Sequence, residues 1–294
     1  MAYLIFLSGL PGAGKSTFRN FLNNFVIIDN DEIRKELYQL KEVNINGQIK
    51  LKGLKEEYEL IKYVLEKGKF KINNNLKKRI IDYLNKYKIS IPRLLEFIER
   101  IENNSENKNK EYVLELEKII SDFNIDTSQF KILIFNIKRQ IEKLSISKKI
   151  TIYDKIPHTR NKEVFDIFYQ RIKENINNEN NIVIDGNNLF FSHINRIIDF
   201  TKELNKDKIY TPYLITWWKV PLKEIKKRNK GRKFYQIVPE EVIDKMYNTL
   251  KNLDINQLNI PKKNIIDVSN CSVKELEEIA NKFNRKKIEM EHSL

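Results

Sequence analysis

Cysteine and histidine are scarce in this sequence, which has one cysteine and three histidines among 294 residues. The single Cys271 excludes an internal disulfide, and the scattered histidines do not form the spacing of a zinc site. We interpret Cys271, His193 and His292 as structural residues. A reducing compartment, the cytoplasm, is the expected location.

Long apolar runs are also missing. No run approaches the roughly 20 residues that a membrane-spanning helix needs, so no membrane segment is expected. The apolar segment 3–7 lacks the basic region that precedes the core of a signal peptide. It leads into a glycine-rich stretch and is predicted to be a buried strand.

Positive charge is abundant, because 54 Lys and Arg face 40 Asp and Glu and give a net charge of +14. An excess of this size favours an anionic partner such as a nucleotide or a nucleic acid. Lys, Asn and Ile are all frequent, as AT-rich codons would produce, so part of the excess need not mark a binding surface.

The order of expected elements predicts an α/β protein with a parallel sheet that helices cover on both faces. Residues 1–39 and 158–294 alternate strands with helices. The predicted strands after the first are 25–28, 182–184, 209–217 and 265–266. The predicted helices begin near Asp31, span 164–176 and 194–204, and follow Pro221, Pro239 and the capping pair Ser272 and Glu275.

Residues 40–157 differ from the rest of the chain. Glycine is nearly absent there and apolar residues recur every three or four positions, as in amphipathic helices. We therefore predict an all-helical insertion, with polar connectors at 73–75 and 103–110, that interrupts the α/β domain.

The strongest motif lies directly after the first strand, where Gly9 to Thr17 read Gly-Leu-Pro-Gly-Ala-Gly-Lys-Ser-Thr. This is the G-x-x-x-x-G-K-[ST] phosphate-binding loop, which turns backbone N–H groups toward phosphate oxygens. Lys15 would reach the β- and γ-phosphates and Ser16 would bind Mg²⁺. The sequence thus predicts a site for ATP and Mg²⁺ formed by Gly9, Gly12, Ala13, Gly14, Lys15, Ser16 and Thr17.

The strand at 182–184 ends in Asp185-Gly186-Asn187-Asn188, without the glutamate that activates water in many ATP-hydrolysing motors. This favours transfer of the phosphoryl group to an acceptor. Small GTPases lack that glutamate too, so hydrolysis stays open.

Asp31 and Arg34 are the candidates for the acceptor side. Their spacing places both on one face of a helix at the carboxyl edge of the sheet, where ligands bind in such folds. Asp31 could accept the proton of an attacking hydroxyl and Arg34 could hold a neighbouring phosphate. Alternatively, Asp29 or Asp31 only caps the helix and Arg34 pairs with a surface acid.

Segment 219–233 carries eight basic residues and one acidic residue, a net charge of +7. Arg228 and Arg232 are four residues apart and can point together toward phosphates, and Gly231 would give flexibility to a lid at 228–239. The alternative is a solvated basic helix face. Of Trp217 and Trp218, which could stack on a base, at least one is expected in the core.

Together, the loop at 9–17, Asp31-x-x-Arg34, Ile182 to Asn188 and Arg228-Asn229-x-x-Arg232 resemble the phage-type polynucleotide 5'-hydroxyl kinase family. Val238-Pro239 and Lys245-Met246-Tyr247 extend the resemblance, which covers about 1–38 and 158–285 and leaves the insertion unmatched.

The resemblance implies a P-loop kinase fold and transfer of the γ-phosphate of ATP to the 5'-hydroxyl of RNA or DNA. It implies that Lys15 and Ser16 bind phosphates and Mg²⁺, and that Asp31 is the general base. Arg34 would contact the acceptor, and Arg228 and Arg232 would clamp the phosphates.

Two departures from the family pattern concern the acceptor and a second activity. Asp185 and Asn187 would contact the substrate, but Gly186 stands where the family has threonine. The 3'-phosphatase motif of some members is absent, so only kinase activity is implied.

Other readings share parts of these motifs. O-phosphoseryl-tRNA kinase has a similar loop, Asp-x-x-Arg helix and lid, and zeta-type toxin kinases share the loop and an acidic base. A small-molecule kinase, and a nucleic-acid-binding protein that uses ATP only as a switch, also stay open. The insertion could contact RNA or a protein partner.

Overall fold

The computed structural model describes residues 2–68, 70, 72–103, 110–204 and 210–291, with side chains to Asn284. The chain forms two compact units. One unit comprises the residues up to Arg34 together with those from Lys162 onward, and the other comprises Lys35–Asn161.

The first unit is built on a five-stranded parallel sheet with the strand order β2-β6-β1-β7-β8. The strands are β1 (Tyr3–Ser8), β2 (Phe25–Asp29), β6 (Asn181–Asp185), β7 (Thr211–Thr216) and β8 (Ile265–Asp267). All six residues of β1 are buried, as expected for a central strand covered on both faces. The predicted parallel sheet is therefore confirmed.

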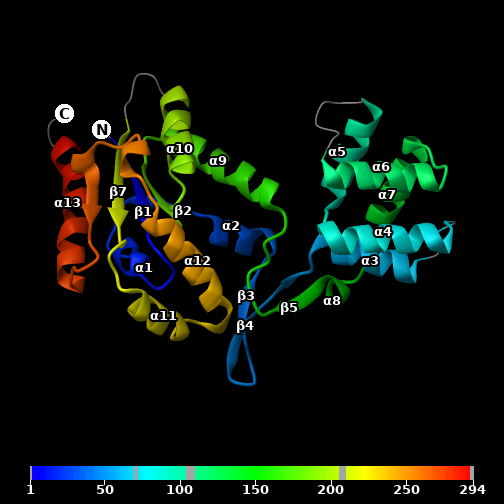
Figure 1. Ribbon diagram of the computed structural model, residues 1–294, viewed down its shortest axis with the longest axis horizontal. Helices are drawn as coiled ribbons and strands as arrows, with labels where there is room; N and C mark the ends of the chain where they lie inside the picture. The colour runs from blue at the N-terminus through cyan, green and yellow to red at the C-terminus, as the bar shows by residue number, and fades with distance from the viewer. Residues whose placement is uncertain (1, 69, 71, 104–109, 205–209, 292–294) are drawn as a thin grey trace. The chain divides into compact units, whose positions relative to one another are not determined.

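Helices lie on both sides of this sheet, with α13 on one side and α9 and α10 on the other (Figure 1). The helices of this unit are α1 (Lys15–Arg19), α2 (Asn30–Leu37), α9 (Asn161–Asn177), α10 (Phe191–Leu204), α11 (Leu222–Lys230), α12 (Glu240–Lys251) and α13 (Val273–Glu291). Ser272 and Glu275 form the predicted capping box, since the Ser272 N–H donates to the Glu275 carboxylate at 2.7 Å and the Glu275 N–H donates to Ser272 Oγ at 3.3 Å.

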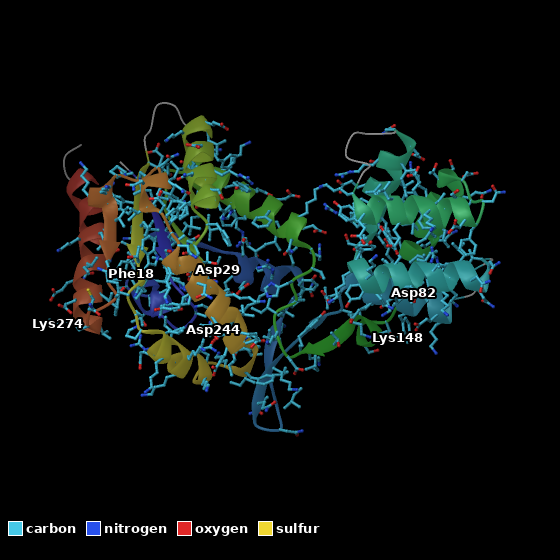
Figure 2. The ribbon with its side chains drawn as sticks, in the orientation of Figure 1. Phe18, Asp29, Asp82, Lys148, Asp244 and Lys274 are labelled. Carbon is cyan, nitrogen blue, oxygen red and sulfur yellow. The ribbon has the colours of Figure 1, made fainter. Side chains whose placement is uncertain are left out.

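Trp217 belongs to the core that supports the phosphate-binding loop. Its side chain is 2% exposed, and its ring packs edge-on against Phe18 with the centroids 5.9 Å apart. Phe18 lies on the short helix α1 (Figure 2). The expectation that at least one of the two tryptophans is a core residue is confirmed, and Trp217 is not available to stack on a base.

The second unit contains a sheet, so the prediction of an all-helical insertion is wrong. Strands β3 (Lys41–Ile45), β4 (Gln48–Leu54) and β5 (Ile150–Tyr153) form a three-stranded antiparallel sheet in that order. Asn46 and Gly47 join β3 to β4 and both have positive φ, 51° and 80°. Asn-Gly is the preferred pair for such a two-residue turn, and the helical periodicity further along the chain hid this local signal.

The rest of the second unit is helical, as predicted. Its helices are α3 (Glu57–Lys67), α4 (Asn74–Tyr87), α5 (Ile91–Glu102), α6 (Glu111–Asp122), α7 (Thr127–Glu142) and the short α8 (Ile146–Lys149). Asn73 caps α4 by accepting the Asn75 N–H at 2.7 Å, so the predicted connector 73–75 is mostly helix start. The connector predicted at 103–110 falls largely on 104–109, outside the described residues. Among the helices that the structure describes, none has the length and apolarity to cross a bilayer.

Candidate functional site

The glycine-rich loop at 9–17 connects β1 to α1 in a conformation that requires its glycines. Gly12 and Gly14 have φ values of 84° and 115°, which side-chain-bearing residues rarely adopt. The Lys15 ammonium folds back and donates to the carbonyl oxygens of Gly9 at 2.8 Å and Leu10 at 3.1 Å. The loop is thus a concave set of backbone groups with one cation at its centre.

Lys15 is desolvated, and burial lowers the pKa of its ammonium to about 8. The positive charge of Arg232 lowers the pKa of Lys15 further, while Asp185 and Asp29 oppose these effects. A partly dehydrated ammonium in a glycine-rich loop is the kind of group that can bind a phosphate.

Helix α11, which carries the basic segment, packs directly on this loop. A Cβ atom added to Gly12 would lie 3.1 Å from the carbonyl oxygen of Ile225 and 3.3 Å from the backbone nitrogen of Asn229. The approach of the helix therefore depends on a glycine at position 12, and it brings the predicted lid next to the glycine-rich loop.

Asn229 closes the lid segment. Its side chain is 1% exposed, donates to the carbonyl oxygen of Val238 at 2.8 Å and accepts the Val238 N–H at 3.1 Å. Gly231 has a φ of −83°, which any residue can adopt, so the structure gives no conformational reason for a glycine hinge there. The side-chain amide of Asn229 instead links the beginning of the predicted lid, at residue 229, to its end at Val238.

The two lid arginines differ. Arg228 is exposed and its Nε donates to Glu224 at 2.8 Å. Burial lowers the pKa of the Arg232 guanidinium and the negative charge of Asp31 raises it. Arg232 thus interacts electrostatically with Lys15 on the loop and with Asp31 on α2.

The start of α2 holds the acceptor-side candidates. Asp29 Oδ1 accepts the Asp31 N–H at 2.7 Å, so Asp29 has the capping role that the sequence left open. Arg34 is buried and its guanidinium donates to Asp31 Oδ1 at 3.1 Å. The structure therefore brings Asp31 and Arg34 together as an ion pair on one helix face, with the Asp31 side chain 54% exposed.

Two carboxylates meet where β2 and β6 end, because Asp29 and Asp185 are register partners. Arg19 of α1 donates to Asp185 at 2.8 Å and lies 3.6 Å from Asp29. Burial and the neighbouring charge of Asp185 raise the pKa of Asp29 to about 6. The sequence analysis did not predict the contacts of Arg19 with Asp29 and Asp185. These contacts require β2 and β6 to be neighbours in the sheet, which local sequence does not reveal.

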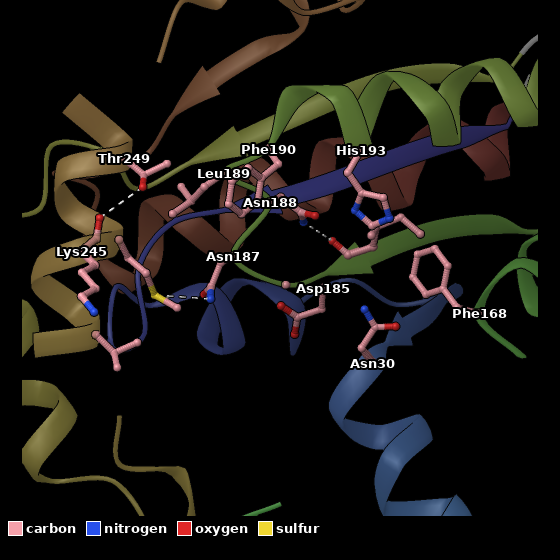
Figure 3. Close-up of a pocket in the computed structure, with 14 residues that line it drawn as sticks. Asn30, Phe168, Asp185, Asn187, Asn188, Leu189, Phe190, His193, Lys245 and Thr249 are labelled. Atoms are coloured by element: carbon pink, nitrogen blue, oxygen red, sulfur yellow. Dashed lines mark hydrogen bonds between the residues drawn. The ribbon is translucent and has the colours of Figure 1, made fainter. Parts of the chain in front are cut away.

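The loop after β6 is fixed by Asn188, which has a φ of 45°. Its amide donates to the carbonyl oxygens of Leu7 at 2.8 Å and Ile184 at 3.1 Å. Asn187 is held on both sides, since its carbonyl oxygen accepts the Gly9 N–H at 3.1 Å and its amide lies 3.7 Å from the Met246 sulfur (Figure 3). Asn187 is thereby anchored between the phosphate-binding loop and α12.

Two further features bear on a metal ion. Ser16 is exposed at the start of α1. Its hydroxyl would be accessible there to a cation that accompanies a bound phosphate. Among the described residues, no group of three or more His, Cys, Asp or Glu side chains is placed to hold a metal by itself. Mg²⁺ usually binds proteins through one or two groups and takes its other ligands from phosphates and water, so a hydroxyl such as that of Ser16 is a suitable ligand.

The other loop positions support this arrangement. The Ala13 N–H donates to the Leu10 carbonyl oxygen, and the Thr17 N–H donates to that of Gly14, each at 3.1 Å. Trp218, unlike Trp217, donates a hydrogen bond from its ring N–H to Ser8 Oγ at 2.9 Å. Trp217 and Trp218 therefore both contact residues next to the glycine-rich loop, Phe18 and Ser8 respectively.

The predicted residues of the first unit thus converge at the carboxyl ends of β1, β2 and β6. Arg19 is an addition that motif spacing did not reveal, whereas Asn188 and Asn229 lay inside the predicted motifs without a role of their own. Searches against protein-family models and curated proteins gave no match to this chain.

Proposed function

We propose that this protein is an ATP- and Mg²⁺-dependent kinase that phosphorylates the 5'-hydroxyl of a polynucleotide. The single observation that carries the proposal is the close packing of α11 on the glycine-rich loop, where a Cβ atom added to Gly12 would lie 3.1 Å from the carbonyl oxygen of Ile225 and 3.3 Å from the backbone nitrogen of Asn229. Arg232 follows this helix and is electrostatically coupled to Lys15 on the loop and to Asp31 on α2. One cation would therefore serve both the loop and the acceptor helix.

On the donor side, the loop amides and Lys15 would hold the β- and γ-phosphates, and Ser16 would hold the Mg²⁺ that accompanies them. ATP supplies the transferred phosphoryl group, and Mg²⁺ offsets the charge that its phosphates carry. Lys15 would leave the carbonyl oxygens of Gly9 and Leu10 and turn to the phosphates.

On the acceptor side, Asp31 would orient the attacking hydroxyl and accept its proton. A bond forms between the hydroxyl oxygen and the γ-phosphorus, the bond from this phosphorus to the β–γ bridging oxygen breaks, and ADP leaves. Arg34 fixes the direction of the Asp31 carboxylate and would bind the phosphodiester next to the reacting sugar.

Arg232 would neutralise the phosphoryl group during transfer, since it lies in the field of both sides of the site. Its desolvation strengthens this role because charge interactions grow as water is excluded. Arg228, which is exposed and paired with Glu224, would join only if it releases that partner.

The test is transfer of γ-labelled phosphate from ATP to single-stranded 5'-hydroxyl RNA and DNA oligonucleotides, with tRNA and a nucleotide sugar as competing acceptors. Asp31→Asn should keep ATP binding and lose transfer by about 100-fold or more. Label on tRNA or on the nucleotide sugar alone would keep the kinase chemistry and replace the acceptor. ATP binding without any transfer would favour the ATP-switched binding protein.

A further inference from the structure

A pocket beside the proposed site has no role in the mechanism above. It encloses about 370 Å³, within the size range of small-molecule sites. Its walls come from the start of α2, the loop after β6, and helices α9, α10 and α12, all in the first unit. Figure 3 shows the lining side chains, among them Asn30, Phe168, Asp185, His193 and Lys245.

Two buried polar atoms on this wall lack hydrogen-bond partners. Asn30 Oδ1 and His193 Nε2 are both inaccessible to solvent, and neither is bonded to any residue that the structure describes. A buried polar atom without a partner is unfavourable, and most such atoms in folded proteins are satisfied. Both residues line the pocket, so a turn of the Asn30 amide or of the His193 ring would let a ligand with complementary polar groups satisfy them.

Aromatic rings hold His193 in place. The Phe168 ring lies nearly parallel to the imidazole with the centroids 6.1 Å apart, and Phe165 meets it edge-on at 6.0 Å. Burial and the charge of Arg196 lower the pKa of His193, so the imidazole is neutral near pH 7 and offers one donor and one acceptor.

The rest of the lining suits a flat heterocycle attached to a phosphorylated sugar. Phe190, a pocket residue, is 70% exposed, and an exposed phenyl ring is a stacking surface for a base. Lys245 is an exposed cation on α12 that also lines the pocket. Apolar contact comes from Leu189, Val242 and Met246.

We infer that this pocket takes the unpaired base of the terminal nucleotide, with Asn30 and His193 as its hydrogen-bonding residues and Phe190 as its stacking surface. The inference rests on the proposed function. Asn30 and Asp31 are the first two residues of α2, so a base held at Asn30 lies at the same end of this helix as the proposed general base. Lys245 attracts the phosphate that follows the first sugar.

The experiment compares two single-stranded 5'-hydroxyl oligonucleotides, one with an ordinary first nucleotide and one whose first nucleotide is an abasic tetrahydrofuran. We expect the abasic acceptor to have a KM about tenfold higher, from the lost stacking and hydrogen bonds. The value of kcat should change less than KM, because the groups that carry out transfer are untouched.

Substitutions then assign the effect to the pocket. His193→Phe keeps a ring against Phe168 and removes the polar nitrogen, and should raise KM about fivefold for the ordinary acceptor only. Phe190→Ala should act in the same way. The matched control is Phe135→Ala, which truncates another exposed phenyl, 53% exposed on α7, and should leave the KM ratio of the two acceptors unchanged.

A direct binding measurement separates this inference from the proposed function. Calorimetric titration with a nucleoside 3'-monophosphate, without ATP, should give binding that His193→Phe and Asn30→Ala weaken about fivefold. Equal KM values for the two acceptors would overturn the base pocket and leave the kinase intact. If no acceptor is phosphorylated, the titration alone decides, and absence of binding would then overturn the inference.

Discussion

Asp29 and Asp185 face each other as register partners at the ends of two parallel strands, and Arg19 contacts both carboxylates. Burial, and after it the neighbouring charge of Asp185, raise the pKa of Asp29 to about 6.

The raised pKa of Asp29 predicts a pH-dependent gain of stability for Asp29→Asn. The unfolded carboxyl loses its proton near its ordinary pKa of 3.8, whereas folded Asp29 keeps the proton up to about pH 6. Wild-type stability therefore falls as the pH rises between these values. The variant avoids this loss and should gain up to about 3 kcal/mol at pH 8, from about two pKa units.

Urea unfolding at pH 8 and at pH 4.5 checks this prediction. The Asn side chain can still accept the Asp31 N–H, so the cap is retained. The gain should shrink to about 1 kcal/mol at the lower pH, where folded Asp29 is mostly neutral and only the unfolded carboxyl has lost its proton. The same gain at both pH values would show that charge is not its cause.

Lys15 predicts a pH dependence of ATP binding. Its pKa of about 8 means that it is mostly charged at pH 7 and mostly neutral above pH 9. Because phosphates bind the charged form, the dissociation constant for ATP should rise by about tenfold per pH unit above pH 8. Titration of ATP between pH 7 and 9.5 measures it, and Lys15→Ala should bind weakly with a flat profile. A flat wild-type profile would contradict the desolvated lysine.

Gly12 and Gly231 form a matched pair of substitutions. Alanine at position 12 must adopt a φ of 84° and press against α11, at a cost of roughly 1–2 kcal/mol for the backbone alone. Gly12→Ala should therefore weaken ATP binding about tenfold. Gly231→Ala meets no atom closer than the Arg228 carbonyl oxygen at 3.6 Å and should leave ATP binding and kcat unchanged. A large loss of kcat in Gly231→Ala would instead support the flexible glycine in the lid that the sequence analysis predicted.

Asn229 predicts a link between stability and the lid. Asn229→Ala removes both hydrogen bonds to Val238 and leaves buried backbone groups unpaired, at a cost of about 1–3 kcal/mol. The melting temperature should fall, and the rate of transfer should fall with it because Arg232 follows Asn229 by three residues. Asn248→Ala on α12, which is exposed, is the control and should change neither quantity.

The sequence predicted the parts of the site that depend on local spacing. The loop at 9–17, the Asp31–Arg34 pair and the basic helix each depend on only a few neighbouring residues. The strands of the parallel sheet were also predictable, because buried strands flanked by turns read as short apolar runs.

Features that depend on long-range pairing were out of reach. The meeting of Asp29 with Asp185 needs the order of strands, and the contact of α11 with Gly12 needs the path of a helix more than 200 residues later. The polar atoms of Asn30 and His193 gave no signal at all, since nothing in their spacing places them on one pocket. The β3–β4 hairpin was different, because Asn46-Gly47 between alternating residues is a local signal that the sequence analysis missed.

The central claim is that Asp31 receives the proton of a polynucleotide 5'-hydroxyl while Arg232 neutralises the moving phosphoryl group. The most direct measurement is the transfer of γ-labelled phosphate to 5'-hydroxyl oligonucleotides by wild-type protein, Asp31→Asn and Arg232→Ala, with ATP affinity measured in parallel. The account predicts labelled 5' ends with wild type, and losses of about 100-fold or more in kcat for each variant. ATP affinity should survive in Asp31→Asn. Unlabelled oligonucleotides with wild type, or full transfer by Asp31→Asn, would contradict it.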